Sequence, residues 1–144
     1  MSEFIIKKEI LIDAPPESVF DALTDSEKIV EYFPLREVNS KWKVGSEVHY
    51  KGEVDGSEFT DYGTIDELNR PLKYKYTYWS DNHGTERVPE NHLSICYQLS
   101  REGSGTRLRV EQSNIKIKEM YDQMNSHVWA YLLERLKEYV ESHT

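Results

Sequence analysis

The spacing of hydrophobic positions divides the chain into four parts. Residues Phe4–Ile12 are rich in isoleucine and predict a first strand. Residues 13–34 carry the start and stop signals of short helices. Residues 46–114 alternate between apolar and polar positions, which predicts strands, and from Lys118 onward apolar residues recur every three or four positions, as in a helix.

Two short helices are predicted after the first strand. The run Asp13–Pro16 ends that strand, and its last proline suits the first turn of a helix because its missing N–H would have no partner there. Thr24 and Glu27 have the capping-box spacing, which predicts that they begin the second helix by satisfying each other's free backbone donors. Pro34 disfavours helical geometry at Phe33 and should end this helix.

Consecutive hairpins are predicted in the middle of the chain, because turn residues recur at short intervals. These turns are Asp55-Gly56, Asn69–Pro71, Asp81–Gly84 and Gly103–Gly105. The strands predicted beside them are Ser46–Val54, Glu58–Leu68, Leu72–Trp79, Asn91–Ser100 and Thr106–Asn114. Alternation gives an inward face made of Val48, Tyr50, Leu72, Tyr74, Tyr76, Tyr78, Leu93, Ile95, Tyr97, Leu99, Leu108 and Val110. The stretch with Trp42 and Gly45 is interpreted as a connection.

The last segment predicts one long amphipathic helix. Its apolar stripe consists of Met120, Met124, Val128, Leu132 or Trp129, Leu136 and Val140. A strand, two helices, a run of strands and a long helix together predict an α+β fold in which a curved antiparallel sheet wraps around the C-terminal helix. A pocket can then lie between the sheet and that helix.

Composition indicates one domain over residues 1–144 and argues against several classes of protein. A domain of 144 residues typically buries about 68–70% of the surface of its unfolded chain. The single Cys96 cannot form an intrachain disulfide, and no leader or long apolar run stands out, so we expect a cytoplasmic protein without a membrane span. The formal net charge of −8 would repel phosphates, which argues against nucleic acid as a partner.

The sequence contains no obvious catalytic constellation. The five histidines include no pair at the i, i+4 spacing, so we expect neither a metal site nor a cofactor. Cys96 is interpreted as a small strand residue. His83 and His92 flank the polar stretch Ser80–Glu90 and could meet at a pocket mouth, although two unrelated surface histidines are the commoner case. The stretch itself is either a lid or a surface loop.

Tyrosine is unusually frequent, with ten copies, and five of them share the predicted inward faces with Gln112. A buried hydroxyl without a partner costs roughly 1–3 kcal/mol, so such a group implies mutual hydrogen bonds, water or a ligand. The alternative is that each hydroxyl reaches solvent at the sheet edge. The walls predicted for a cavity are Phe20, Phe33, Tyr50, Tyr76, Tyr78, Tyr97, Met124 and Trp129, with Gln112 as a polar anchor.

Several segments resemble a known family. Ile10–Asp25 resembles the entry motif of the START-like, or SRPBCC, superfamily. Later landmarks are similar to its branch of heat-shock protein 90 ATPase activator homologues: Val44–Val48, Gly63–Glu67 with Pro71-Leu72, and Gly105–Leu108. The resemblance covers nearly the whole chain and implies a helix-grip fold with a hydrophobic cavity. Two positions depart from the branch: Tyr32, where tryptophan is common, and His127-Val128, where a glycine is common.

The resemblance implies three functions. Members bind lipids, sterols, polyketides or other apolar molecules, some catalyse cyclisation or hydrolysis, and a few act as co-chaperones. We therefore expect this chain to bind a small hydrophobic or amphipathic ligand between sheet and helix, without covalent chemistry. The first alternative is a cyclase or hydrolase that uses a cavity tyrosine, His83 or His92 as acid or base. The second is a protein-interaction module, which only the branch resemblance supports.

Overall fold

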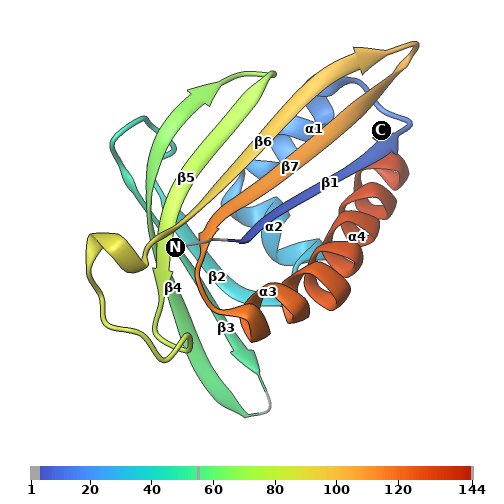
Figure 1. The fold of residues 1–144 in the computed structure, drawn as a ribbon. Coiled ribbons are helices and arrows are strands. Elements are labelled where there is room, and N and C mark those ends of the chain that lie inside the picture. Colours follow the sequence, from blue (N-terminus) through green and yellow to red (C-terminus); the bar gives the residue numbers. More distant parts are fainter. Residues whose placement is uncertain (1–3, 55, 144) are drawn as a thin grey trace.

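The computed structural model describes residues 4–54 and 56–143, which form a seven-stranded antiparallel sheet with helices against its concave side (Figure 1). The strands are β1 (Phe4–Ile12), β2 (Leu35–Ser40), β3 (Glu47–Val54), β4 (Ser57–Asn69), β5 (Lys73–Ser80), β6 (Leu93–Glu102) and β7 (Gly105–Ile115). The helices are α1 (Pro16–Leu23), α2 (Ser26–Tyr32), α3 (Lys118–Gln123) and α4 (Trp129–Ser142). A 3-10 turn (Pro89–Asn91) precedes β6, and a π-helical segment (Met124–Val128) joins α3 to α4. These elements confirm the predicted α+β class.

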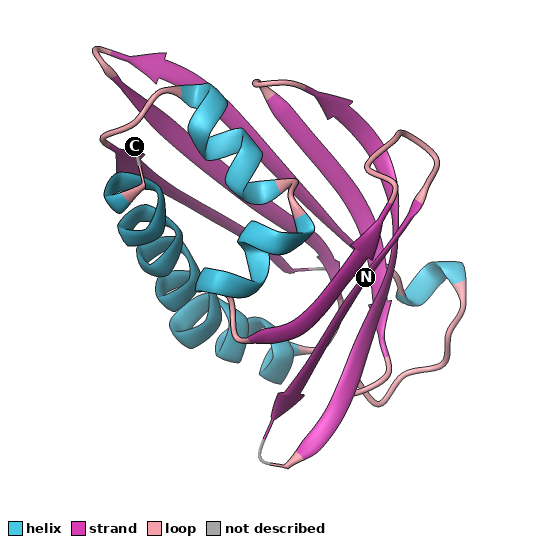
Figure 2. Cartoon of the chain, turned by 180° about the vertical axis from the view of Figure 1, so that it is seen from behind, coloured by secondary structure: helices cyan, strands magenta, loops and turns pink. Residues whose placement is uncertain are grey.

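The first strand along the chain pairs with the last strand along the chain. Its order is β1-β7-β6-β5-β4-β3-β2, so β2 to β7 follow the chain and β1 pairs back against β7. In that pairing Ile12 lies opposite Thr106 and Phe4 lies opposite Ile115. Figure 2, drawn from behind, shows α1, α2 and the C-terminal helix on the same side of the sheet. A helix-grip arrangement follows, with α1 and α2 lying across one part of the concave face and α4 along another.

The two short helices begin and end near the predicted positions, but the second uses a different cap. The N-cap of α2 is Asp25, whose carboxylate accepts a hydrogen bond from the Glu27 N–H at 2.9 Å. Thr24 instead donates its hydroxyl to the Phe20 carbonyl at the end of α1, also at 2.9 Å. The predicted capping box between Thr24 and Glu27 was therefore wrong. Aspartate caps a helix at least as well as threonine, and here it lies one residue later.

The predicted strands are present, with ends that differ by one or two residues. Leu35–Ser40 forms β2 where a connection was predicted; Leu35 and Val38 are its buried residues, and the positions between them are charged. Leu72 was predicted to face inward but is 50% exposed, because it lies in the turn before β5, where its N–H bonds the Asn69 carbonyl at 2.7 Å. The predicted turn at Asp55-Gly56 includes Asp55, which lies outside the described residues.

One π-helical turn decides which residues of the C-terminal helix face the sheet. The N–H of Trp129 bonds the carbonyl of Met124, five residues earlier rather than four. In a regular helix Val128 would lie on the same face as Met124. Because the π turn contains one extra residue, Trp129 lies on that face instead. Trp129 is accordingly 4% exposed and Val128 is 38% exposed. The prediction that Val128 lies on the buried stripe was wrong, while Leu132, Leu136 and Val140 are buried as predicted.

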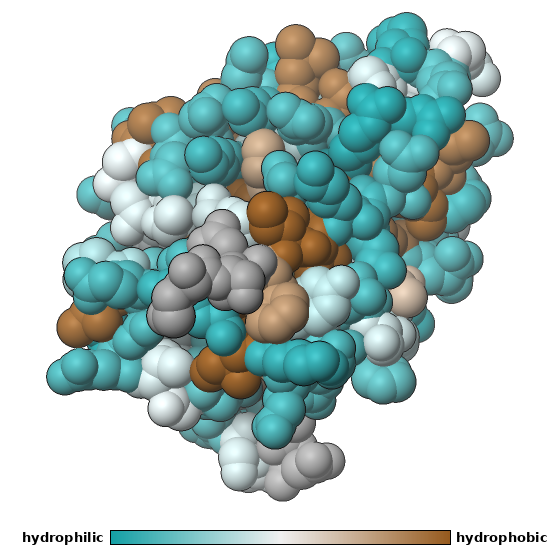
Figure 3. Space-filling model, in the orientation of Figure 1, coloured by the Kyte–Doolittle hydropathy of each residue, from teal (hydrophilic) through white to brown (hydrophobic). Residues whose placement is uncertain are grey.

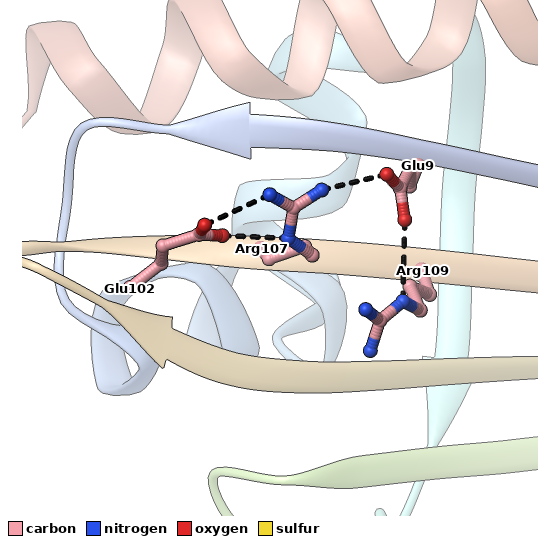
Figure 4. Close-up of polar contacts among 4 residues, drawn as sticks. All are labelled: Glu9, Glu102, Arg107 and Arg109. Carbon is pink, nitrogen blue, oxygen red and sulfur yellow. Dashed lines mark hydrogen bonds and ion pairs between the residues drawn. The ribbon is translucent and has the colours of Figure 1, made fainter.

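The opposite face of the sheet carries charged side chains. Figure 4 shows Arg107 of β7 donating to Glu102 of β6 and to Glu9 of β1, with Arg109 on the other oxygen of Glu9. Their shortest contacts are 2.6 Å for Arg107 with each glutamate. Exposed pairs of this kind contribute about 0–1 kcal/mol each. The view in Figure 3 is mostly hydrophilic, with scattered hydrophobic residues, as solvated surface should be.

Candidate ligand-binding cavity

A cavity of about 270 Å³ lies between the concave face of the sheet and the helices. Strands β3 to β7 contribute to its wall on one side, and α2, the π-helical segment and α4 contribute on the other. The lining is mainly aromatic and aliphatic, with a few polar side chains at defined places. This is the position in which the sequence predicted a pocket.

Most of the side chains predicted as cavity walls lie on this lining. They are Phe33, Tyr50, Tyr76, Tyr78, Tyr97, Gln112, Met124 and Trp129. Phe20 is the exception: it is 2% exposed and belongs to the hydrophobic core, outside the lining. Leu23, one turn later on α1, lies on the cavity in its place. Whether these residues bind a ligand stays a prediction.

Gln112 joins the two sides of the cavity. Its side-chain oxygen accepts a hydrogen bond from the Trp129 indole N–H at 2.7 Å, and its nitrogen donates to the Tyr78 hydroxyl at 3.0 Å. The same nitrogen lies 3.3 Å from the Met124 sulfur. Gln112 is 1% exposed, so the protein already satisfies its buried amide. Its main effect is to hold β5, β7 and α4 in a fixed relation around the cavity.

The tyrosine hydroxyls fall into two groups. Some bond within the protein: Tyr50 and Tyr74 share a hydrogen bond of 2.8 Å, and the Tyr32 hydroxyl donates to the Ala22 carbonyl at 2.9 Å. The hydroxyls of Tyr76 and Tyr97 have no hydrogen-bond partner among residues 4–54 and 56–143. Burial raises the pKa of both phenols well above the usual range, so they remain neutral donors.

A carboxyl group that sequence reasoning missed also lies on the lining. Asp61 of β4 is paired across the sheet with Ser80 of β5. Burial raises the pKa of Asp61 to about 7, and the charge of Asp81 adds to this shift. The sequence held one signal of this placement, because Asp61 has the same strand parity as Phe59 and Ile65.

The polar loop before β6 brings one histidine to the cavity and not the other. His83 lines the cavity and meets the Tyr78 ring edge-on, with ring centroids 5.8 Å apart. Its Nδ1 is buried and lacks a hydrogen-bond partner within the described part of the chain. Burial lowers the pKa of His83, so its imidazole is neutral at neutral pH. His92 lies outside the lining, with its Nδ1 2.8 Å from the Val88 carbonyl oxygen, so the two histidines do not meet there.

The same loop is fastened to the outer surface of the sheet. The Trp79 indole N–H donates to the Thr85 hydroxyl at 3.1 Å. The Arg87 guanidinium lies over the Tyr62 ring, 4.3 Å from its centre, in a cation–π contact. These contacts hold the loop in a defined position, with His83 directed to the cavity.

Two further observations bear on the chemistry of the chain. Across the described residues, no three His, Cys, Asp or Glu side chains are grouped so that they could hold a metal ion. Within that same part of the chain, no helix is both long and apolar enough to cross a membrane.

The curved sheet, the two short helices and the long C-terminal helix around one cavity define a START-like helix-grip protein. The chain belongs to the family described as Activator of Hsp90 ATPase homolog 1-like protein, which matches residues 13–141. No curated protein matches the sequence.

Solved structures with the same fold support this assignment. ChR145 from Cytophaga hutchinsonii is 30% identical with a TM-score of 0.83, and the match covers 99% of this chain and 98% of that one. MLL2253 from Mesorhizobium loti is 20% identical with a TM-score of 0.80, covering 98% and 99%. The Aha1 dimer from Colwellia psychrerythraea is 22% identical with a TM-score of 0.77, covering 96% of each chain. At such identities the latter two show the fold alone.

Proposed function

We propose that the chain is a single helix-grip domain that binds a small hydrophobic or amphipathic molecule in the cavity between the sheet and the C-terminal helix. The mainly apolar lining with a few fixed polar groups is typical of small-molecule sites. The observation that carries the proposal is the pair of cavity tyrosines, Tyr76 and Tyr97, whose hydroxyls lack partners among the described residues. A ligand oxygen or nitrogen would satisfy them. The proposal includes a cytoplasmic location, which the lone Cys96 favours.

A ligand panel tests this proposal. We expect at least one class of lipid, sterol or aromatic polyketide to raise the melting temperature in proportion to the logarithm of its concentration, because a ligand that binds only the folded state stabilises it. If no class raises the melting temperature or shows binding by calorimetry, the proposed function is wrong.

Removing the two free hydroxyls tests how the ligand is held. We expect the double variant Tyr76→Phe and Tyr97→Phe to bind a ligand from the panel roughly 5- to 160-fold more weakly, at about 0.5–1.5 kcal/mol for each of the two lost hydrogen bonds. Its unfolding free energy should change little, because no protein partner is lost. Tyr139→Phe is the matched control, since the Tyr139 hydroxyl bonds Glu31 at 2.8 Å on the surface. Equal weakening in both variants would contradict the assignment.

The second candidate is an acid–base enzyme of the cyclase or hydrolase type. The observation that favours it is the neutral His83 beside Tyr78 on the cavity lining. A neutral imidazole accepts a proton from a bound molecule, and a neighbouring phenol donates one. The test is product formation from panel ketones and esters, followed by mass spectrometry. If the chain is an enzyme, His83→Gln should lose turnover with little change in ligand affinity. If no bound panel member is turned over, the enzyme candidate is wrong and ligand binding remains the proposed function.

A protein partner is the remaining alternative, and family membership alone supports it. Purified chaperone as bait, with the folded chain as prey, distinguishes it from ligand binding. Capture that persists when the cavity is saturated by a panel ligand would favour a surface interaction.

A further inference from the structure

Charge is distributed unevenly around the cavity. Among the described residues, its lining includes two carboxylates, Glu53 and Asp61, and neither lysine nor arginine. Glu53 lies at the surface and pairs with Arg36 at 2.5 Å, so its charge is already compensated. Asp61 forms no ion pair within the described part of the chain, and no basic side chain contributes to its electrostatic surroundings. The cavity therefore has a single acidic group without a countercharge among those residues.

The groups around Asp61 come from three segments. Tyr50 of β3 lies opposite Asp61 on one side and Ser80 of β5 on the other. The Ser80 hydroxyl donates its proton to the Asn82 side-chain oxygen at 2.7 Å. The Tyr76 and Tyr78 phenols of β5 are close enough to Asp61 for its charge to raise their pKa values further. Asp81 adds a like charge, and His83 of the following loop is neutral. Among the described residues, an ionised Asp61 therefore has no positive charge beside it, and a desolvated carboxylate in such a place is unfavourable.

We propose that the cavity selects organic amines, with an apolar body against the aromatic walls and a protonated amino group beside Asp61. This inference rests on the proposed function and narrows its ligand class. The ammonium group supplies the missing countercharge where a carboxylate alone is costly to bury. Two acceptors that its N–H donors can use belong to residues of the same lining, the Asp61 carboxylate and the Tyr76 hydroxyl oxygen.

The aromatic walls act in the same direction. An organic cation is attracted to the electron-rich faces of tyrosine and tryptophan rings, and this attraction strengthens when the cation is desolvated. A ligand carboxylate or phosphate would instead face Asp61 without a lysine or arginine on the described lining to receive it. Fatty acids and phospholipids are thus disfavoured within the broader class of amphipathic ligands.

Three compounds with one apolar body test the inference on the unmodified protein: 4-butylbenzylamine, 4-butylbenzyl alcohol and 4-butylbenzoate, measured by calorimetry at pH 8. We expect the amine to bind at least about tenfold more tightly than the alcohol, because a charge-assisted hydrogen bond is worth roughly 1.5–3 kcal/mol. The benzoate should bind most weakly. Carboxyl NMR should also show that the amine, and not the alcohol, lowers the pKa of Asp61.

Two variants test whether Asp61 causes the preference for the amine over the alcohol. Asp61→Asn keeps the shape of the side chain and should bring the affinities for amine and alcohol within about threefold of each other. Glu53→Gln is the matched control, because it removes the other lining carboxylate, which Arg36 already neutralises, and it should keep the preference for the amine.

The outcomes separate the two proposals. If the alcohol binds as tightly as the amine, or if the preference survives in Asp61→Asn, the inference is overturned while ligand binding stands. If none of the three compounds binds but a neutral panel member does, the inference also fails. If nothing binds at all, the proposed function fails with it. Should Asp61→Asn not fold, the ranking of the three compounds and the Asp61 titration in the unmodified protein decide the question.

Discussion

Gln112 is the residue whose loss should disturb the cavity most. In Gln112→Leu the Trp129 indole N–H stays buried without the acceptor that now lies 2.7 Å away. We expect the free energy of unfolding to fall by roughly 1–3 kcal/mol in urea titrations. Adding Trp129→Phe removes the stranded donor, so the double variant should lose less than the sum of the single changes. Strict additivity would mean that the hydrogen bond contributes nothing.

Asp61 should make stability depend on pH in the direction opposite to most carboxylates. Its pKa in the folded protein is about 7 against an ordinary value of 3.8, so the folded state holds the proton more tightly. The stability that protonated Asp61 contributes is therefore fully present below about pH 4. It is lost as the pH rises from about 4 to 7, and Asp61 causes no further change above pH 7. The total loss is on the order of 4 kcal/mol.

The variant Asp61→Asn isolates this effect, because other titrating groups cancel in the difference from the unmodified protein. The difference in unfolding free energy should be smallest near pH 4 and reach its largest value above pH 7, with the asparagine variant the more stable there. Urea unfolding at several pH values measures it. A difference that does not vary with pH would show that Asp61 is ionised normally.

Single residues also show what sequence reasoning can and cannot find at the site. Tyr76 and Tyr78 were predictable because the alternation along β5 is unbroken. Asp61 was not, since a charged residue in a strand is normally assigned to the solvent face and only its parity argued otherwise. Phe20 was assigned to the cavity although it packs elsewhere in the core, because periodicity predicts burial and does not say which neighbours a buried ring meets.

The π-helical segment yields a prediction about whole elements. Its extra residue places both Met124 and Trp129 on the cavity, five positions apart. Deleting the exposed Ser126 should turn this segment into regular helix and keep both residues on one face, at the ordinary spacing of four. We expect the unfolding free energy to change by about 1 kcal/mol or less.

A matched deletion provides the control. Removing the exposed Glu134 from the regular part of α4 should rotate Leu136 and Val140 away from the sheet by about 100°. Burying fewer large side chains should then cost several kcal/mol, which chemical denaturation would detect. Equal losses from both deletions would contradict the role given to the π turn.

The sequence predicts some helices and strands more clearly than others. The long strands β5 to β7 alternate over many residues and were predicted nearly to their ends. β2 was missed because only two of its residues face the core, too few to establish a period. The π turn had no signal of its own: both Val128 and Trp129 fitted an apolar stripe, and the choice depends on packing against Gln112.

Across the whole molecule, some strands of the sheet are packed against helices more closely than others. Helices pack mainly against β1, β2, β6 and β7, whereas β3 to β5 face the helices across the cavity. We expect amide hydrogen exchange in β3 and β4 of the free protein to be faster than in β7, because local opening there exposes less packed apolar surface. A bound ligand should slow exchange chiefly in β3 and β4, as measured by mass spectrometry. Equal slowing in all strands would contradict this picture.

The pairing of β1 with β7 has a consequence for how the chain acquires its structure. Phe4 and Ile12 find their partners only at Ile115 and Thr106. A ribosome adding about 5–20 residues per second delivers those partners on the order of 5–20 seconds after β1 has been made. During that interval an isoleucine-rich segment has no strand to pair with and exposes backbone donors and acceptors that other chains can bind. Although β1 is made before the other six strands, it therefore cannot join the sheet until β7 has been made, and the nascent chain is most open to aggregation before β7 is complete.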